Sequence, residues 1–309
     1  MNRRAFVGLA AALLPFDGDA ELSSIPIIDT HIHLFDPTRP QGVPWPPKDN
    51  PVLYKPALPA RFRGIAEPLG VVGAIEIEAS PWLEDNQWVL DIAANNPIIV
   101  GTVGDLEPGK PDFRKQLDRF HKNQLFRGIR YGNLWDRDLG ARLSEPAFVT
   151  DLKALASADL VLDTANPDPA LIRAVVRLTD KVSNLRVVID HLPNLQLPGD
   201  RASRDRYEHD LRLLGTRPLL FVKVSQVLQC TNKQVVLDQL WDVFGEDRLL
   251  YGSDWPNSDP WGTYPKVLNI VRQYFAKRGR SAAEKFFWKN SVQAYRWVKR
   301  GPKQPAQAT

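Results

Sequence analysis

The chain is poor in cysteine and has no long apolar segment. Cys230 is the only cysteine among 309 residues, so an intramolecular disulfide is impossible and the fold cannot depend on one. No apolar run approaches the roughly 20 residues that span a bilayer, and we expect no stable membrane association. Apolar residues still make up 43% of the sequence and charged residues 25%, which is typical of a globular domain with a sizeable core.

The charge is weakly basic and has no extended run of one sign. The formal net charge is +4 and the pI is about 9.1. Lysines and arginines are scattered among carboxylates, and only the segment around Lys299-Arg300 forms a small cluster. We therefore expect a solvated surface and a small-molecule partner rather than nucleic acid. A positive net charge could also attract an anionic substrate. The oligomeric state stays open.

The N-terminal segment has the pattern of an export signal. Arg3 and Arg4 precede a short apolar run from Phe6 to Phe16, which is too short to cross a membrane. Paired arginines before such a run are typical of a twin-arginine signal. We expect residues 1–22 to be this signal and the protein to be periplasmic. An ordinary tail on a cytoplasmic protein is the alternative.

Short apolar runs alternate with amphipathic stretches along the rest of the chain. Near-continuous apolar runs are typical of strands buried on both faces, as in a parallel sheet. Alternation of strand and helix, repeated about eight times, predicts the α/β class and a single-domain (β/α)8 TIM barrel over residues 23–300. A disordered tail, residues 301–309, is expected to follow. A doubly wound sheet is the alternative, but no Gly-rich phosphate loop follows the first strand. The expected strands are Ile25–Asp29, Val71–Ile77, Ile98–Val103, Phe126–Arg130, Leu160–Asp163, Arg186–Asp190, Leu219–Val224 and Arg248–Tyr251.

Small polar residues indicate where two of the helices begin, and proline marks a long loop. Ser144 is a candidate cap for a helix that starts near Pro146, and Thr231 is one for the helix Gln234–Phe244. The Pro-rich stretch Asp36–Pro59 is too long for a simple turn. We expect it to form an extended loop that lies over the barrel mouth.

Two histidines stand together at the end of the first predicted strand. In an extended segment, residues i and i+2 point to the same side, so His31 and His33 can face one point. Barrel enzymes carry their active sites at this carboxyl end of the strands. Two imidazoles placed there can bind a metal ion or donate hydrogen bonds to a developing oxyanion.

An aspartate and a third histidine follow two other predicted strands. Asp254 comes after the eighth strand, where a carboxylate can act as a general base or can merely cap a turn. His191 comes after the sixth strand, where it is either functional or a hydrogen-bonded core residue. Since the strand ends meet at one mouth, convergence of His31, His33, His191 and Asp254 favours an active site.

Four ordered motifs resemble those of the amidohydrolase superfamily, in its amidohydrolase-2 branch. This branch includes L-fuconolactonase and 2-pyrone-4,6-dicarboxylate lactonase. The resemblance extends from about Ile25 to about Val298, and the segment Asn290–Tyr295 is similar to the closing helix of the family. The motifs are Ile28-Asp29-Thr30-His31-Ile32-His33, Phe126-Arg127-Gly128-Ile129-Arg130, Ile189-Asp190-His191-Leu192-Pro193 and Tyr251-Gly252-Ser253-Asp254-Trp255-Pro256.

The resemblance implies a role for each of these positions. Asp254 matches the aspartate that activates the attacking water, and the three histidines match those around the substrate carbonyl. Arg130 and Arg127 match basic residues that hold a substrate carboxylate or hydroxyl, for which the planar guanidinium is suited. For Arg127, a surface or inter-helix ion pair is the alternative. Tyr54 matches a loop that contacts substrate, with loop packing as the alternative. Glu78 either orients a ligand or histidine or forms a structural ion pair.

The metal ligand set of the superfamily is incomplete in this chain. Metal-dependent amidohydrolases add histidines from strands five and six, but the segment Asp159–Asn166 contains no histidine. His121 and His209 fall in helix-like stretches and are expected on the surface. We therefore expect chemistry that requires no cofactor. A single divalent ion such as Zn²⁺ on His31, His33, His191 and Asp254 remains the alternative.

These observations favour a hydrolase that opens a small sugar lactone or carboxylated lactone. In this hypothesis Asp254 takes a proton from water, the water attacks the ring carbonyl, and the three imidazoles stabilise the developing oxyanion. Arg130 anchors the substrate. A metal-dependent decarboxylase or amide hydrolase of the same superfamily is one alternative. A non-catalytic exported binding protein is the other.

Overall fold

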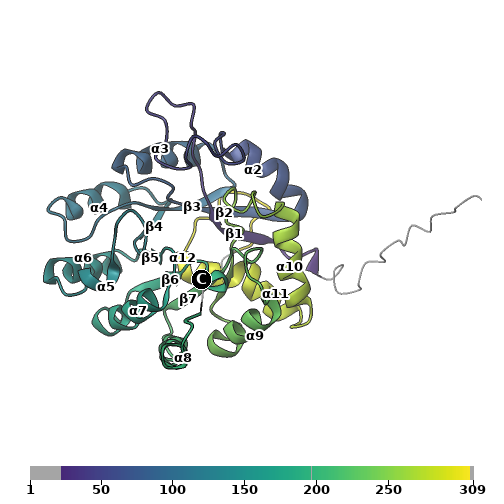
Figure 1. The fold of residues 1–309 in the computed structure, drawn as a ribbon. Helices are drawn as coiled ribbons and strands as arrows, with labels where there is room; N and C mark the ends of the chain where they lie inside the picture. The colour runs from purple at the N-terminus through teal and green to yellow at the C-terminus, as the bar shows by residue number, and fades with distance from the viewer. Residues whose placement is uncertain (1–21, 196, 307–309) are drawn as a thin grey trace, which may run out of the picture.

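The computed structural model describes residues 22–195 and 197–306, and these residues form a barrel. Eight parallel strands are hydrogen-bonded in the order β1 to β8, and helices surround them (Figure 1). The ring is nearly closed where the segment after β8 meets β1. There, the amide of Asp254 donates to the carbonyl of His31 at 2.9 Å, and the amide of His33 donates to the carbonyl of Trp255 at 2.8 Å. The predicted export signal lies, apart from its last residue, outside the described residues.

The strands agree with the sequence prediction. Each predicted end lies within one residue of the observed end, except in the first strand. That strand starts two residues later and ends three residues later than predicted, so His31 lies inside it rather than after it. The strands are β1 (Ile27–Ile32), β2 (Val71–Ile77), β3 (Ile99–Gly104), β4 (Phe126–Arg130), β5 (Val161–Thr164), β6 (Arg186–Ile189), β7 (Leu220–Val224) and β8 (Leu249–Tyr251).

The helices pack their apolar faces on the outside of the barrel. Both predicted caps, Ser144 and Thr231, are wrong. The hydroxyl of Ser144 donates to the carbonyl of Ala141 instead, and α9 is preceded by Asn232 without a side-chain cap. The helices are α2 (Pro59–Ala66), α3 (Leu83–Ala94), α4 (Phe113–His121), α5 (Leu139–Arg142), α6 (Pro146–Ser157), α7 (Pro169–Lys181), α8 (Arg201–Gly215), α9 (Lys233–Phe244), α10 (Tyr264–Ala276), α11 (Arg280–Glu284) and α12 (Asn290–Tyr295), with the 3-10 helices η1 (Glu67–Leu69) and η2 (Leu192–Asn194) and the π-helix η3 (Lys285–Lys289).

The inward-facing side chains change from apolar to charged along three neighbouring strands. Val161 of β5, Val188 of β6 and Phe221 of β7 belong to the apolar cluster inside the barrel. Two residues further along a strand, a side chain points to the same face. Those positions carry charged residues that are fully buried: Asp163, Asp190 and Lys223. An ionic layer therefore lies between the apolar interior and the mouth.

The C-terminal segment closes the opposite end of the barrel. Ala294 and Tyr295 of α12 and the following Trp297 join the inner apolar cluster. In contrast to the expected disordered tail, residues 301–306 lie against the barrel. The buried amide of Gln304 donates to the carbonyls of Val72 and Pro97 at 3.0 and 2.9 Å.

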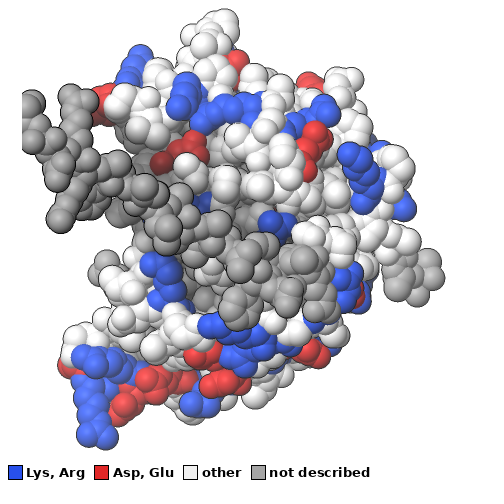
Figure 2. Space-filling view, turned by 90° about the vertical axis from the view of Figure 1, so that its right-hand side faces the viewer, with Lys and Arg blue, Asp and Glu red and all other residues white. Residues whose placement is uncertain are grey.

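The outer surface is mixed in charge. On the face shown in Figure 2, lysines and arginines lie beside aspartates and glutamates, as the scattered sequence pattern predicts. Within the described residues, no helix is long and apolar enough to cross a membrane.

Candidate active site

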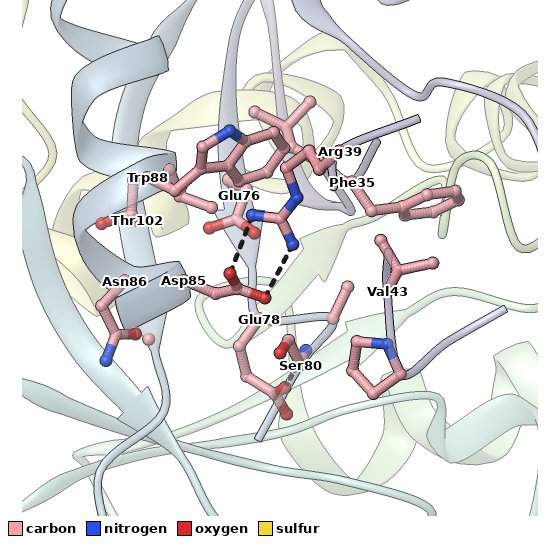
Figure 3. A pocket seen from close by; sticks show the side chains of 15 residues that line it. Phe35, Arg39, Val43, Glu76, Glu78, Ser80, Asp85, Asn86, Trp88 and Thr102 are labelled. Atoms are coloured by element: carbon pink, nitrogen blue, oxygen red, sulfur yellow. Dashed lines mark hydrogen bonds and ion pairs between the residues drawn. The ribbon is translucent and has the colours of Figure 1, made fainter. Parts of the chain in front are cut away.

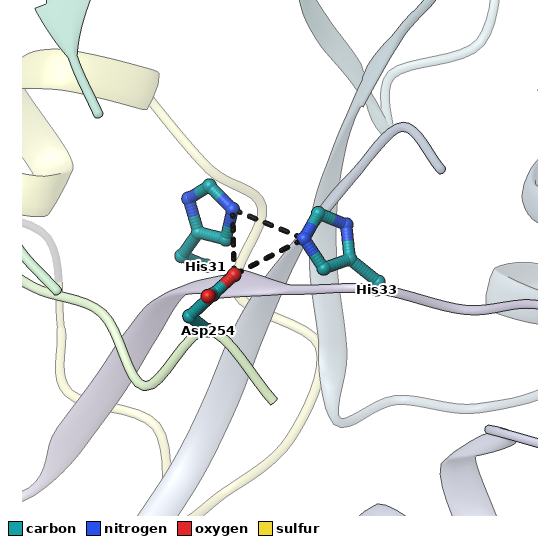
Figure 4. A group of neighbouring side chains, drawn as sticks. All are labelled: His31, His33 and Asp254. Atoms are coloured by element: carbon teal, nitrogen blue, oxygen red, sulfur yellow. Dashed lines mark hydrogen bonds and ion pairs between the residues drawn. The ribbon is translucent and has the colours of Figure 1, made fainter. Parts of the chain in front are cut away.

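The four residues predicted from the sequence meet at the carboxyl end of the strands. The Nε2 atoms of His31 and His33 lie 3.3 Å apart. The Oδ1 atom of Asp254 is 3.5 Å from His31 Nε2 and 3.2 Å from His33 Nε2, so the three side chains point at one spot (Figure 4). His191 Nε2 is 3.9 Å from the same oxygen. All four residues are buried.

Local backbone irregularities aim these side chains. The pairing of β1 with β2 shifts register between Asp29 and Ile32, which lets both Ile28 and His31 face the barrel interior. His191, Gln226 and Asp254 follow three different strands in the left-handed region, with φ of 54°, 54° and 59°. Non-glycine residues adopt this conformation at a cost, and such strain gathers at functional sites.

The two oxygens of Asp254 have different surroundings. Oδ2 accepts hydrogen bonds from the amides of Gln226 at 2.9 Å and Asn257 at 2.8 Å. Oδ1 faces the imidazoles instead. Burial opposes ionisation, but the neighbouring imidazoles of His191, His33 and His31 together hold the pKa of Asp254 well below its usual range. Asp254 is therefore a fixed carboxylate whose Oδ1 faces the imidazoles.

Each histidine is held from its other ring nitrogen. His33 Nδ1 lies 2.8 Å from the carbonyl oxygen of Ile77, and His191 Nδ1 lies 2.8 Å from the hydroxyl of Ser225. Burial lowers the pKa of His191 to about 4, so its imidazole is neutral at pH 7. Burial and the nearby ammonium of Lys223 also lower the pKa of His31 well below its usual value.

Charged side chains form a connected layer under the histidines. Lys223 Nζ lies 2.5 Å from Asp163 Oδ2 and 2.9 Å from Asp190 Oδ1. Asp190 also accepts from Arg130 Nε at 3.0 Å. Burial opposes ionisation of Asp190, but Lys223, His31 and Arg130 hold its pKa well below the usual range. Each charge in this layer therefore lies within ion-pair distance of an opposite charge.

A cavity of about 200 Å³ opens above the histidines. His33 and His191 form part of its floor, and two indole rings, Trp45 and Trp135, stand in its walls. The ring of Trp45 lies 5.7 Å from that of His33. Its other polar lining residues are Glu78, Arg130, Asn166, Gln226 and Asn257.

The four predicted substrate-binding residues divide into two pairs. Arg130 and Glu78 line the cavity, and Glu78 accepts a hydrogen bond from Trp135 Nε1 at 3.1 Å. Arg127 does not reach it, because its guanidinium donates to the backbone carbonyls of Tyr295 and Gln124. Tyr54 is half-buried in the loop after β1 and is not among the residues that line the cavity.

The long loop after β1 is fastened beside the cavity. Arg39 forms a bidentate ion pair with Asp85 of α3, at 2.8 and 3.1 Å, and its guanidinium lies over the ring of Trp88 at 4.2 Å (Figure 3). A second cavity of only about 20 Å³ lies under this pair. The anchored loop carries Trp45 over His33, as expected for a loop that covers the mouth.

The donor set has the spacing of a metal site. Zinc binds imidazole nitrogen at about 2.0–2.1 Å, so ligand atoms at two tetrahedral vertices lie about 3.4 Å apart. The separations of 3.2, 3.3 and 3.5 Å among His31, His33 and Asp254 fit this value. These residues, with His191 beside them, are the ones that would hold a divalent ion.

Several residues of the site were not predicted from the sequence. Ser225, Gln226 and Asn257 carry no recognisable pattern, because short polar side chains after a strand are common in turns. Lys223 did carry a signal, since it lies two residues after Phe221 on the inner face of β7. A lysine inside a buried strand is unusual and marks a functional or paired position.

Comparison with known proteins agrees with this geometry. The amidohydrolase family matches residues 28–297. An L-fucono-1,5-lactonase from Burkholderia ambifaria is 25% identical over 240 residues, which cover 75% of this chain and 80% of that protein. An amidohydrolase from Burkholderia multivorans, solved with bound zinc, has a TM-score of 0.77 at 20% identity, over 88% of this chain and 99% of that one. A probable 2-pyrone-4,6-dicarboxylic acid hydrolase from Acinetobacter baumannii, solved with citric acid, has a TM-score of 0.70 at 19% identity. The match covers 87% of this chain and 99% of that one.

A barrel with imidazoles and a carboxylate gathered at the carboxyl ends of its strands defines a class of barrel hydrolases. The chain belongs to the amidohydrolase family, in its amidohydrolase-2 branch, because the family matches most of its length. It is therefore a hydrolase.

Proposed function

We propose that the protein hydrolyses a small lactone at this mouth, with Asp254 as the general base. The observation that carries the proposal is the asymmetry of Asp254. Two amides fix Oδ2, while Oδ1 points at three imidazoles, two of which, His33 and His191, line the cavity. A water molecule on the cavity side of Oδ1 would lie within reach of both the base and a bound carbonyl.

The reaction then proceeds in two steps. Asp254 takes a proton from the water as its oxygen bonds to the lactone carbonyl carbon, and an imidazole N–H group stabilises the resulting oxyanion. The intermediate collapses as the ring C–O bond breaks. Asp254 returns the proton to the leaving alkoxide, so the product is a hydroxy acid.

The lining favours an uncharged, polyhydroxylated lactone over a carboxylated one. Among the described lining residues, Arg130 is the only one with a permanent positive charge, and its Nε already donates to Asp190. Indole walls and amide groups suit the mixed apolar and hydroxyl surface of a sugar ring. The similarity to L-fucono-1,5-lactonase points to the same substrate class.

A panel of sugar lactones and dicarboxylate lactones tests this proposal. Acid release at neutral pH, followed with an indicator dye, should be fastest with a sugar lactone and should be lost in Asp254→Asn. Hydrolysis of no lactone in the panel would refute the proposal. Faster hydrolysis of the dicarboxylates would refute the assignment of substrate class.

Metal-dependent decarboxylation or amide hydrolysis is the second candidate, favoured by the ligand-like spacing of His31, His33 and Asp254. A divalent ion held there would polarise a carbonyl and generate hydroxide from water near neutral pH. The missing histidine in β5 argues against it. Metal content after purification, together with activity after chelation, separates the two candidates.

A further inference from the structure

A lysine is buried directly under the first histidine of the site. Lys223 stands in β7 with no exposed surface. Its ammonium donates a hydrogen bond to Asp163 Oδ2 at 2.5 Å and pairs with Asp190 Oδ1 at 2.9 Å. Its third neighbour is His31 Nδ1, at 3.2 Å. The lysine side chain therefore faces two carboxylates and one imidazole nitrogen, all within 3.2 Å of Nζ.

This contact decides which nitrogen of His31 carries a proton. An ammonium group has no lone pair and can only donate. His31 Nδ1 must therefore accept, and the neutral imidazole then holds its hydrogen on Nε2. The competing partner of Nδ1 is Asp190 Oδ1, which lies farther away at 3.5 Å and is already paired with Lys223.

The neighbouring histidine has the opposite arrangement. His33 Nδ1 faces the carbonyl oxygen of Ile77, which can only accept, so neutral His33 carries its hydrogen on Nδ1 and a lone pair on Nε2. A hydrogen on His31 Nε2 can be donated to this lone pair at 3.3 Å, and it also lies near Asp254 Oδ1, an acceptor 3.5 Å from His31 Nε2. Both neighbours of His31 Nε2 thus favour a hydrogen on that nitrogen.

We infer that Lys223 is a positioning residue that holds His31 as the Nε2–H tautomer, and so makes this histidine a hydrogen-bond donor to the reacting carbonyl and a poor metal ligand. A metal ion needs the Nε2 lone pair, and in this tautomer a hydrogen occupies that position. The donor role rests on the proposed lactone hydrolysis, whereas the tautomer and the metal affinity do not.

The tautomer is measured in the wild-type protein by long-range ¹H–¹⁵N NMR on ¹⁵N-histidine-labelled protein without substrate, with His31 assigned from the spectrum of His31→Asn. We expect a hydrogen-bearing Nε2 and an unprotonated Nδ1. A hydrogen on Nδ1 of His31 would overturn the inference, and this result needs no variant of Lys223.

A second experiment removes the lysine without leaving an unbalanced charge. Lys223→Met combined with Asp163→Asn takes away one positive and one negative charge, and Asp163→Asn alone is the matched control that keeps Lys223. In the double variant, Asp190 becomes the partner of His31 Nδ1–H, so His31 should change tautomer. The affinity for Zn²⁺, measured by calorimetry with zinc alone, should rise at least tenfold over both the control and the wild type, whose net charge equals that of the double variant.

Equal zinc affinity in the double variant and the control would overturn the inference. In the lactone assay, the double variant should lose at least tenfold in kcat with little change in KM, because the contacts of the cavity are unchanged. If no lactone is hydrolysed but the tautomer and zinc results are as expected, the proposed function fails while the role of Lys223 stands.

Discussion

Replacing Asp254 by asparagine removes the proton acceptor and leaves the frame around it in place. Gln226 and Asn257 both donate to Oδ2, so the introduced amide must place its oxygen there and its NH₂ group where Oδ1 was. In that orientation the NH₂ group can donate to the Nε2 lone pair of His33, which lies 3.2 Å from Oδ1 in the wild type. The introduced amide therefore has the same shape as the carboxylate and keeps its hydrogen bonds, but no group remains that can deprotonate water.

The expected loss follows from the role of the base. Proton transfer by a positioned side chain contributes about 10²–10⁴-fold to a rate, which corresponds to roughly 3–5 kcal/mol at the transition state. We expect kcat of Asp254→Asn to fall by about 10³-fold. KM should change little, because Asp254 is buried beneath the cavity. The assay is acid release from the best sugar lactone at neutral pH.

Asp259→Asn is the matched control. Asp259 lies in the same loop but pairs with Arg61, away from the cavity, so its substitution should leave turnover within twofold. Circular dichroism and thermal unfolding establish that both variants are folded. If folded Asp254→Asn keeps turnover within tenfold of the wild type, the assignment of the base is wrong.

Three further predictions concern pH, metal and export. Burial raises the pKa of Glu78 from 4.5 to about 8. We therefore expect kcat/KM to fall as the pH rises through about 8. Glu78→Gln stays uncharged, so its kcat/KM should not show this decrease at alkaline pH. The protonated carboxyl of Glu78 stabilises the fold fully below pH 4.5, and this stabilisation is lost as the pH rises through about 8. This group therefore lowers the free energy of unfolding by at most about 5 kcal/mol over that interval, and chemical denaturation of Glu78→Gln should not show this decrease. Dialysis against a chelator should leave kcat/KM within twofold, whereas a loss that Zn²⁺ or Mn²⁺ restores would contradict metal-independent chemistry. Replacement of Arg3 and Arg4 by lysine should retain the full-length protein in the cytoplasm on cell fractionation, and unchanged periplasmic recovery would count against a twin-arginine signal.

The fold and the centre of the site were predictable because both rest on strand periodicity. Buried parallel strands appear as apolar runs, and residues at their carboxyl ends converge whatever their separation in sequence. This brought His31, His191 and Asp254 together in the prediction, and the structure places them within hydrogen-bonding or ion-pair distance. The first strand was placed too early because backbone bonds to the segment after β8, which lies far away in sequence, extend it.

The same periodicity could have excluded one predicted residue. Arg127 and Arg130 are three positions apart in β4, and an odd separation puts two residues of a strand on opposite faces. Only Arg130 can face the cavity, and Arg127 binds the C-terminal segment outside the barrel. Tyr54 lies in a loop, where no period relates sequence to direction, so its position could not be predicted this way.

The ionic layer explains how one barrel can keep two buried imidazoles, His31 and His191, neutral and differently oriented. Replacing buried ion pairs by apolar residues often leaves the stability of the fold unchanged or increases it. Stability alone therefore does not explain why Lys223, Asp163 and Asp190 are present. Asp190 contacts both Lys223 and Arg130, and each of these cations lies beside a different one of the two histidines. A cation beside a ring nitrogen opposes protonation of the ring and selects the nitrogen that accepts. The charges under the mouth therefore determine which ring nitrogen of His31 and of His191 carries the hydrogen, a property that an apolar core of the same volume could not provide.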